Sequence, residues 1–260
     1  MVQAQLAIAK TWLEAYSRLG KKEQKRVREF IEKFRADPTS RGLNFEKLPG
    51  MRDSKVRSLR VDQTYRVIVV QPDRGDVILC VWVDHHDEAY RWAERKVFEV
   101  NPLSGVLQVY SVEEGQQVGD EEVDAPVPEV EAPSKAAQAD LLLTHVDDEE
   151  LLMSGVPAPL LATVRGLATE SDLDQLAPHL PDDAADMLYL FAAGCDFMTA
   201  LEEASRPMEK VAVVDTEDFS AALERPESQS MFHMLEGGED LEGMLDAPFD
   251  QWRTFLHPSQ

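Results

Sequence analysis

Three β-branched segments between residues 55 and 84 constrain the fold of this chain more than any other feature: KVRSLRVD, TYRVIVVQP and DVILCVWVD. Only the short connections DQ and PDRG separate them, and both are rich in turn-forming residues. Consecutive strands joined by tight turns form an antiparallel meander. The sequence therefore predicts a three-stranded sheet here.

Helical patterns flank this meander. Apolar residues recur at helical spacing from Gln5 to Leu19, and Gly20 ends the pattern. The following stretch, KKEQKRVREFIEKFRADP, places Val27, Phe30, Ile31 and Phe34 on one stripe before Asp37-Pro38. We expect a helical hairpin on the antiparallel sheet, then a short helix in DEAYRWAERK, and a turn and a further strand in NPLSGVLQVYSV.

The composition changes after Val112. Residues 113–138 are rich in Glu, Pro and Gln and contain no aromatic residue, which is typical of a flexible acidic linker. Helical periodicity returns in residues 139–206, where short segments separated by Pro and Gly predict a small acidic helical module. Residues 207–260 combine an expected strand, KVAVVD, with expected helices in DFSAALE, DLEGMLD and FDQWRTFL. The predicted class is α+β, with residues 1–112 as the first domain.

Charge divides the chain in the same way. Residues 1–110 hold 20 Lys and Arg against 15 Asp and Glu, a net charge of +5. The remaining 150 residues hold 6 against 34, a net charge of -28. The basic part could approach nucleic acid, RNA or DNA, by releasing counterions from phosphate. The acidic part suits solubility, spacing or contact with a basic partner.

Other features exclude whole classes of protein. No run approaches the roughly 18 apolar residues that span a bilayer, and the N-terminus lacks the regions of a signal peptide. We therefore expect a cytoplasmic protein with no membrane partner. The two cysteines, Cys80 and Cys195, form neither a disulfide framework nor a zinc set, so both are expected to be buried and reduced.

The stretch VDHHDEAYRWAERK, residues 83–96, suggests metal binding at first sight. Adjacent His85 and His86 would diverge on a strand or turn, and neither an HExxH motif nor a cysteine pair is present, so we expect no metal. The simpler interpretation is a helix N-terminus that Asp84 or Asp87 caps. Tyr90 and Trp92 would then pack this helix on the sheet.

Arginines recur in the neighbouring strands. Alternation places Arg57 with Leu59 and Val61 on one face of the sheet, and Arg60 with Val56 and Ser58 on the other. The first face is the more apolar. We therefore expect Arg57 at the edge of the core and Arg60 towards solvent.

The order of these elements resembles the RelE/ParE toxin superfamily. Two helices, a connector ending in KLPG, the segment LRVDQTYRVIVV, an apolar strand and HHDEAY carry the resemblance over roughly residues 1–110. In its RNA-cleaving branch, the resemblance implies a concave sheet face that binds mRNA in the ribosomal decoding site. The ribosome or an antitoxin-like protein would then be a partner.

Site residues follow from this resemblance. Arg66 with Arg57 or Arg60 would neutralise the scissile phosphate, while His86 and Tyr90 would be the acid and base. Lys47, Arg52 and Lys55 would hold the RNA backbone, with Arg60 alongside them. ParE-like members lack the nuclease activity, and Asp84, Asp87 and Glu88 lower the local positive potential. A non-catalytic docking domain therefore remains the alternative to a ribonuclease.

The chain ending, FDQWRTFLHPSQ, resembles the segment that introduces the motor of UvrD/Rep-like superfamily 1 DNA helicases. The resemblance extends over nearly the whole chain to the N-terminal region of a group of such bacterial enzymes. It implies that Gln260 reads the adenine of ATP once the motor follows. The chain contains no GxxxxGK[ST] motif, so we expect no cofactor here, and ATP with magnesium only in the absent motor.

Three functions therefore remain open. The leading one is an accessory docking region of a DNA helicase, which binds nucleic acid or a partner protein. The second is a RelE-type endoribonuclease. In the third, the acidic half of the chain folds back on the basic domain and inhibits it.

Overall fold

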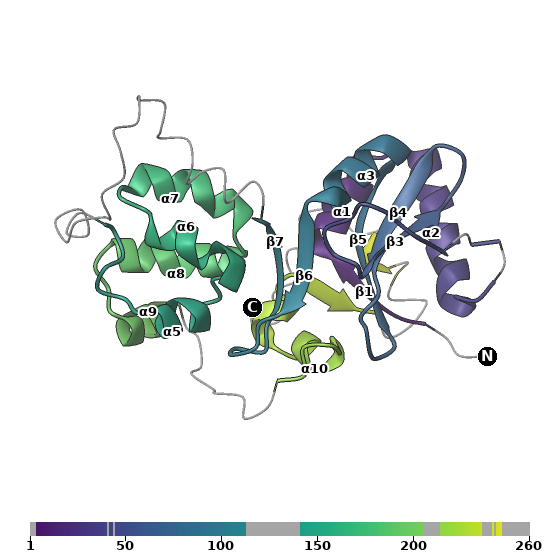
Figure 1. Ribbon diagram of the computed structural model, residues 1–260. Helices are drawn as coiled ribbons and strands as arrows, with labels where there is room; N and C mark the ends of the chain where they lie inside the picture. The colour runs from purple at the N-terminus through teal and green to yellow at the C-terminus, as the bar shows by residue number, and fades with distance from the viewer. Residues whose placement is uncertain are drawn as a thin grey trace. The chain divides into compact units, whose positions relative to one another are not determined.

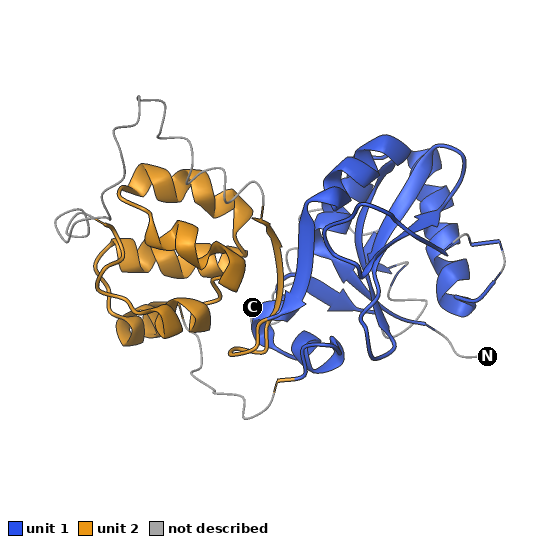
Figure 2. Ribbon diagram, in the orientation of Figure 1, with its two compact units in different colours: residues 1–100, 215–260 blue, residues 101–214 orange. Residues whose placement is uncertain are grey.

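The computed structural model describes residues 4–40, 42–43, 45–112, 141–204, 214–235, 241 and 243–245. The chain has a mixed α/β fold whose main feature is a six-stranded, mostly antiparallel sheet. It divides into two compact units (Figure 2). Residues 1–100 and 215–260 form the first unit, and residues 101–214 form the second.

The first unit contains the large sheet, whose strands follow the order β2-β3-β4-β5-β1-β8 (Figure 1). Its strands are β1 (Gln5–Ala9), β2 (Phe45–Lys47), β3 (Val56–Arg60), β4 (Tyr65–Val70), β5 (Val77–His85) and β8 (Phe232–Met234). Its helices are α1 (Lys10–Ser17), α2 (Lys21–Ala36), α3 (His86–Glu94), α10 (Ser220–Leu223) and α11 (Pro226–Gln229).

The first five residues of the predicted N-terminal helix are instead strand β1. This strand runs parallel to β5, with Leu6 opposite Ile78, so the sheet is not purely antiparallel. Residues 6–9 are all buried. A strand that is covered on both faces reads as a continuous apolar run, which periodicity alone cannot distinguish from a helix. The predicted hairpin is therefore reduced to α1 and α2.

The predicted meander is confirmed. Strands β3, β4 and β5 pair antiparallel in sequence order. The faces follow from the register. Phe34 of α2 packs against the ring of Phe45, which lies opposite Leu59, so α2 covers the face that carries Leu59. Ser58 points to the opposite face.

Helix α3 covers that opposite face. Tyr90 donates to Ser58 Oγ, and the ring of Trp92 stacks on Trp82 of β5 with centroids 4.7 Å apart, as the sequence predicted. The predicted cap is wrong, because His85 is the N-cap residue and its side chain makes no capping hydrogen bond. The Asp84 carboxylate instead accepts from the amide of His85.

Two further strands follow α3. β6 (Lys96–Val100) and β7 (Leu107–Ser111) pair in a small sheet of their own. β7 was predicted and β6 was not. Buried Asp53 fastens β6 to the connector before β3, because its Oδ2 accepts from the amide of Phe98 at 2.9 Å.

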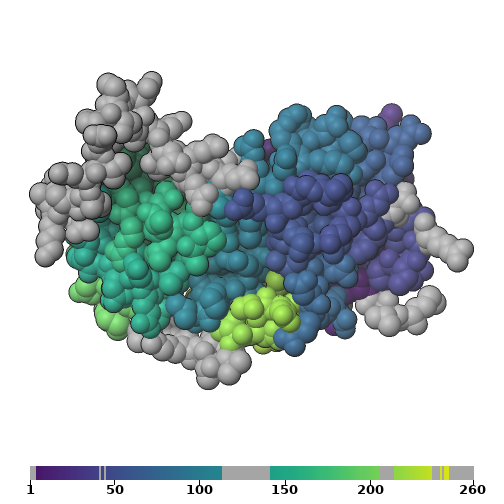
Figure 3. Space-filling view, viewed as in Figure 1, coloured from purple at the N-terminus to yellow at the C-terminus, as the bar shows by residue number. Residues whose placement is uncertain are grey.

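A segment near the end of the chain returns to the large sheet. β8 pairs antiparallel with β1, with Ile8 opposite His233. Phe219 and Phe232 of this segment are buried. In the space-filling view the yellow-green surface of α10 lies next to the blue surface of the N-terminal chain (Figure 3). The predicted first domain, residues 1–112, therefore lacks one strand of this sheet.

The second unit is helical beyond β7, as the pattern of residues 139–206 predicted. Its helices are α5 (Asp148–Met153), α6 (Leu161–Arg165), α7 (Glu170–Leu176), α8 (Asp182–Ala192) and α9 (Phe197–Glu203), with single 3-10 turns η2 (Ala158–Leu160) and η3 (Ala177–His179). Side chains of Asp147, Thr169 and Asp196 cap α5, α7 and α9. Short helices need such caps, because so many of their amides lack internal partners.

Several predicted segments lie outside the described residues. These are the acidic linker of residues 113–138, the residues 210–213 of KVAVVD, and the final helix with Gln260. The helix expected in DFSAALE is present as α10.

Candidate nucleic-acid interface

The strand register brings only some of the predicted site residues together. Arg60 lies opposite Arg66, and Arg66 lies opposite Asp84, so these three form one row across the sheet. This row lies on the face that also carries Ser58. Arg57 lies on the other face, opposite Lys47 of β2. The sheet therefore separates Arg57 from the other candidates for phosphate stabilisation.

Arg60 and Arg66 both donate to the main chain of the β3–β4 turn. Arg66 Nη1 lies 2.7 Å from the carbonyl oxygen of Asp62 and 3.0 Å from that of Tyr65. Arg60 Nε lies 3.3 Å from the same Asp62 oxygen. Arg66 is only 8% exposed, whereas Arg60 is open to solvent, as predicted. Arg66 thus holds the turn, and Arg60 can also reach a ligand.

Asp62 organises this turn through its side chain as well. Its Oδ1 accepts from the amides of Thr64 and Tyr65, at 2.7 and 2.9 Å, and Oδ2 lies 3.3 Å from Arg26 Nη1 of α2. Burial opposes ionisation most strongly, yet these hydrogen bonds and the charge of Arg26 together lower the pKa of the Asp62 carboxyl below its ordinary value. Asp62 therefore stays charged near neutral pH.

The acid and base candidates both lie in α3. Their rings are in contact, with the centroids of His86 and Tyr90 4.4 Å apart. His86 Nδ1 lies 2.7 Å from the exposed carboxylate of Asp87, and Tyr90 Oη lies 3.4 Å from Ser58 Oγ. Each candidate thus has a polar partner within the protein, and neither partner is one of the arginines.

The connector residues are divided between surface and core. Lys47 is exposed on β2, and Arg52 is exposed where its amide donates to Glu94 O. Lys55 forms an ion pair of 3.0 Å with Asp53, whose side chain is 2% exposed. Arg57 Nη1 donates to the carbonyl oxygen of Val56 at 2.9 Å, and its side chain is half-buried, as expected. Lys55 and Arg57 therefore stabilise the fold locally.

Sequence reasoning missed four residues beside this turn: Arg26, Asp62, Tyr65 and His85. The rings of Tyr65 and His85 lie with centroids 4.5 Å apart. Burial, followed by the charges of Glu23, Asp62 and Asp84, raises the pKa of Tyr65. An Asp that opens a turn was a usable signal for Asp62. Arg26 gave none, because 36 residues separate it from Asp62.

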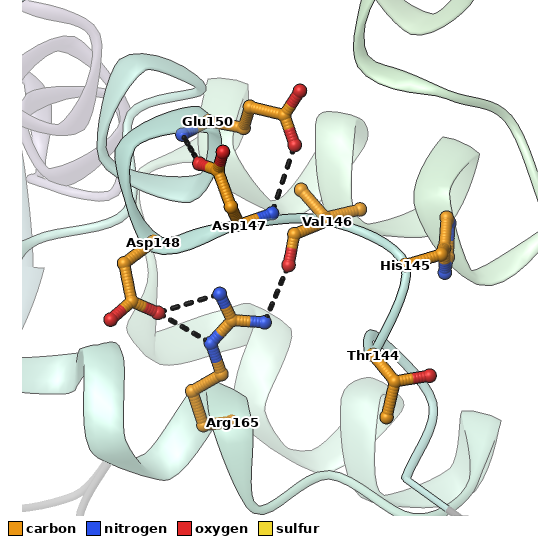
Figure 4. Close-up of a pocket in the computed structure, with 7 residues that line it drawn as sticks. All are labelled: Thr144, His145, Val146, Asp147, Asp148, Glu150 and Arg165. Carbon is orange, nitrogen blue, oxygen red and sulfur yellow. Dashed lines mark hydrogen bonds and ion pairs between the residues drawn. The ribbon is translucent and has the colours of Figure 1, made fainter.

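A shallow depression in the described part of the second unit is lined by residues 144–148, Glu150 and Arg165 (Figure 4). Several of its polar groups stabilise the fold. Arg165 pairs with Asp148 at 2.6 Å and donates to the carbonyl of Val146 at 2.7 Å, while Asp147 and Glu150 form a capping box.

Among the residues that the structure describes, no group of three or more His, Cys, Asp or Glu side chains could hold a metal ion. Cys80 is fully buried, and burial raises the pKa of its thiol to about 12, whereas Cys195 is half-buried. In the same part of the chain, no helix has the length and apolar character that crossing a membrane requires.

The chain matches no protein-family profile and no curated protein.

Proposed function

We propose that the first unit is a nucleic-acid docking module and not a ribonuclease. The engagement of the candidate catalytic groups carries this proposal. Cleavage at a 2′-hydroxyl needs a base, an acid and cationic groups arranged around one phosphate. Here Arg57 lies on the opposite face of the sheet from Ser58, the partner of Tyr90. Arg66 is committed to backbone oxygens.

Binding a nucleic acid requires fewer precisely placed groups than cleaving it does. Phosphate contacts need accessible cations, and the first unit exposes Arg60, Lys47 and the basic side chains at the start of α2, Lys21, Lys22, Lys25 and Arg26. These side chains can hold a phosphate backbone without any proton transfer.

The sequence resemblance to UvrD/Rep-like helicases supplies a biological setting for this module. As part of the N-terminal region of such an enzyme, it would bind a nucleic-acid strand close to a motor that hydrolyses ATP elsewhere in the polypeptide. On this proposal the chain of 260 residues has no ATPase activity of its own.

The full chain is the right sample for a test, because a 1–112 fragment would lack β8 and expose the edge of β1. Labelled RNA and DNA are titrated at several stated salt concentrations, and mRNA integrity is followed by primer extension with translating ribosomes. We expect salt-dependent binding and intact mRNA. Cleavage that disappears in Tyr90→Phe would favour the ribonuclease instead, and an absence of binding to either nucleic acid would reject the docking function.

A further inference from the structure

Three arginines converge on one residue of the β3–β4 turn. Arg26 pairs with the side chain of Asp62, and Arg60 and Arg66 donate to its carbonyl oxygen. The side chain of Arg26 is 60% exposed, and Arg60 is also exposed. Both can therefore exchange water for a phosphate oxygen.

Helix α2 extends this positive surface. Lys22 and Lys25 are exposed, and Lys22 lies one helical turn before Arg26, on the same side of the helix. Lys25 pairs with Glu29 at 3.8 Å, but both side chains are more than 60% exposed, so a competing phosphate can displace this weak interaction. The acidic neighbours that act on Tyr65 are Glu23, Asp62 and Asp84. Arg26 opposes them at Tyr65, and exposed Lys22 and Lys25 add positive charge to the same helix.

An aromatic pair borders the same turn. The amide of Tyr65 donates to Asp62 Oδ1, so Tyr65 lies next to the carboxylate that Arg26 contacts. Tyr65 packs against His85 at a tilt of 45°, and the side chain of His85 is 57% exposed. Accessible aromatic rings beside cationic side chains are what single-stranded nucleic acid requires, because unpaired bases stack while the backbone is neutralised.

We infer that Arg26, Tyr65 and His85, on the side of the sheet that α2 covers, form a binding site for single-stranded nucleic acid, here called the turn site. Arg26 holds a phosphate, and an unpaired base stacks on Tyr65 and His85. The inference rests on the proposed docking function and names the ligand form and the residues. A duplex, whose bases are already stacked, would gain only the contacts to phosphate.

The experiment measures fluorescence anisotropy of labelled oligothymidylate, oligouridylate and a blunt DNA duplex against the full chain over a range of salt. We expect the single strands to bind more tightly than the duplex, and the DNA and RNA strands to show which sugar is preferred. Arg26→Gln should reduce the steepness of the salt dependence by about 0.7, the value for one phosphate contact on a single strand. Tyr65→Leu should weaken single-strand binding about fivefold to 100-fold.

Two further variants separate a specific site from general charge effects and from misfolding. Lys33→Gln removes the same charge from the same helix about 10 Å from Arg26 along its axis, and should leave the salt dependence unchanged. His85→Ala tests the stack at an exposed position, where folding is not at risk.

The outcomes separate the two proposals. If the wild-type chain binds but Arg26→Gln, Tyr65→Leu and His85→Ala bind equally well, the turn site is rejected and the docking function stands. An effect of Lys33→Gln as large as that of Arg26→Gln also rejects the turn site, because general charge would then explain binding. Failure of the wild-type chain to bind any strand rejects the docking function, and the turn site with it.

Discussion

Arg74 contacts the carboxylate of Asp215, 141 residues further along the chain, at 2.5 Å. Arg74 lies in the β4–β5 turn, and it also pairs with Glu217 at 2.8 Å. Its backbone joins in, since the amide of Arg74 donates to the carbonyl of Glu217. The turn and the returning segment are thus linked by side chains and main chain together. This link lies at the start of the segment that supplies α10, α11 and β8.

Buried apolar contacts should stabilise that segment far more than the exposed ion pairs do. Phe219 is fully buried just before α10. Phe219→Ala should lower the free energy of unfolding by about 3–5 kcal/mol, from lost transfer energy and the cavity that remains. Urea unfolding followed by tryptophan fluorescence measures the change. Ala221→Ser, at an exposed position in α10, is the control. Equal stability of the two variants would show that the segment contributes little to the fold.

The close approach of the β4–β5 turn to Asp218 gives a second prediction. Gly75 has φ +89°, and a Cβ there would clash with Asp218 Oδ1, which accepts from the amide of Ser220 at 2.9 Å. Gly50 also has a positive φ, +82°, but open space around it. Gly50→Ala should cost about 1–2 kcal/mol of unfolding free energy from backbone strain alone. Gly75→Ala should lower the free energy of unfolding further. The difference between the two variants in thermal unfolding measures the effect of the contact with Asp218. Identical losses would argue against that contact.

Local patterns predicted the meander and the faces of its strands. Alternation separated Arg57 from Arg60 correctly, because side chains of a strand alternate whatever lies around it. Strand β1 was missed, because residues 6–9 are apolar on both sides. Strand β8 was missed because it has three residues and pairs with a strand more than two hundred residues earlier. No pattern near Phe232 reveals such a partner.

The candidate site also combines contacts that local patterns predict with contacts that depend on distant segments. The row of Arg60 and Arg66 follows from strand alternation and tight turns, which are local. The contact of Arg26 with Asp62 depends on how α2 lies over the sheet, and that packing is tertiary. Lys55 was assigned to RNA from the resemblance of its segment to the RelE/ParE superfamily. Its burial beside Asp53 could not be read from the connector sequence.

The Asp53–Lys55 pair provides a third prediction. Asp53 Oδ1 accepts from the amide of Lys55 at 2.9 Å, and Oδ2 accepts from the amide of Phe98. Asp53→Ala would leave two amides and a largely buried ammonium group without this partner, and should cost about 3–5 kcal/mol of unfolding free energy. Lys55→Gln, which leaves both amide hydrogen bonds in place, should cost less. Oligonucleotide binding by folded Lys55→Gln should match the wild type; a large loss would return Lys55 to the interface.

Asp62→Asn gives a fourth prediction, with one effect on stability and another on binding. The folded pKa of Asp62 is lowered, so its charged form stabilises the protein above the ordinary carboxyl pKa of 3.8. This contribution disappears as the pH falls below 3.8 and through the folded value. The stability advantage of wild type over Asp62→Asn should therefore be present at neutral pH and vanish under acidic conditions, as urea unfolding at each pH would measure. A constant difference across this range would contradict the assigned ionisation.

The binding effect of Asp62→Asn has the opposite sign. Removing one negative charge from among Arg26, Arg60 and Arg66 should strengthen phosphate binding, by about fivefold for a contribution of roughly 1 kcal/mol between charges about 4 Å apart in water. The Asn side-chain oxygen can still accept from the amides of Thr64 and Tyr65, so the turn is retained. A variant that is less stable yet binds oligothymidylate more tightly is hard to explain by misfolding. Weaker binding, in a variant whose circular dichroism matches the wild type, would place the phosphate elsewhere on the molecule.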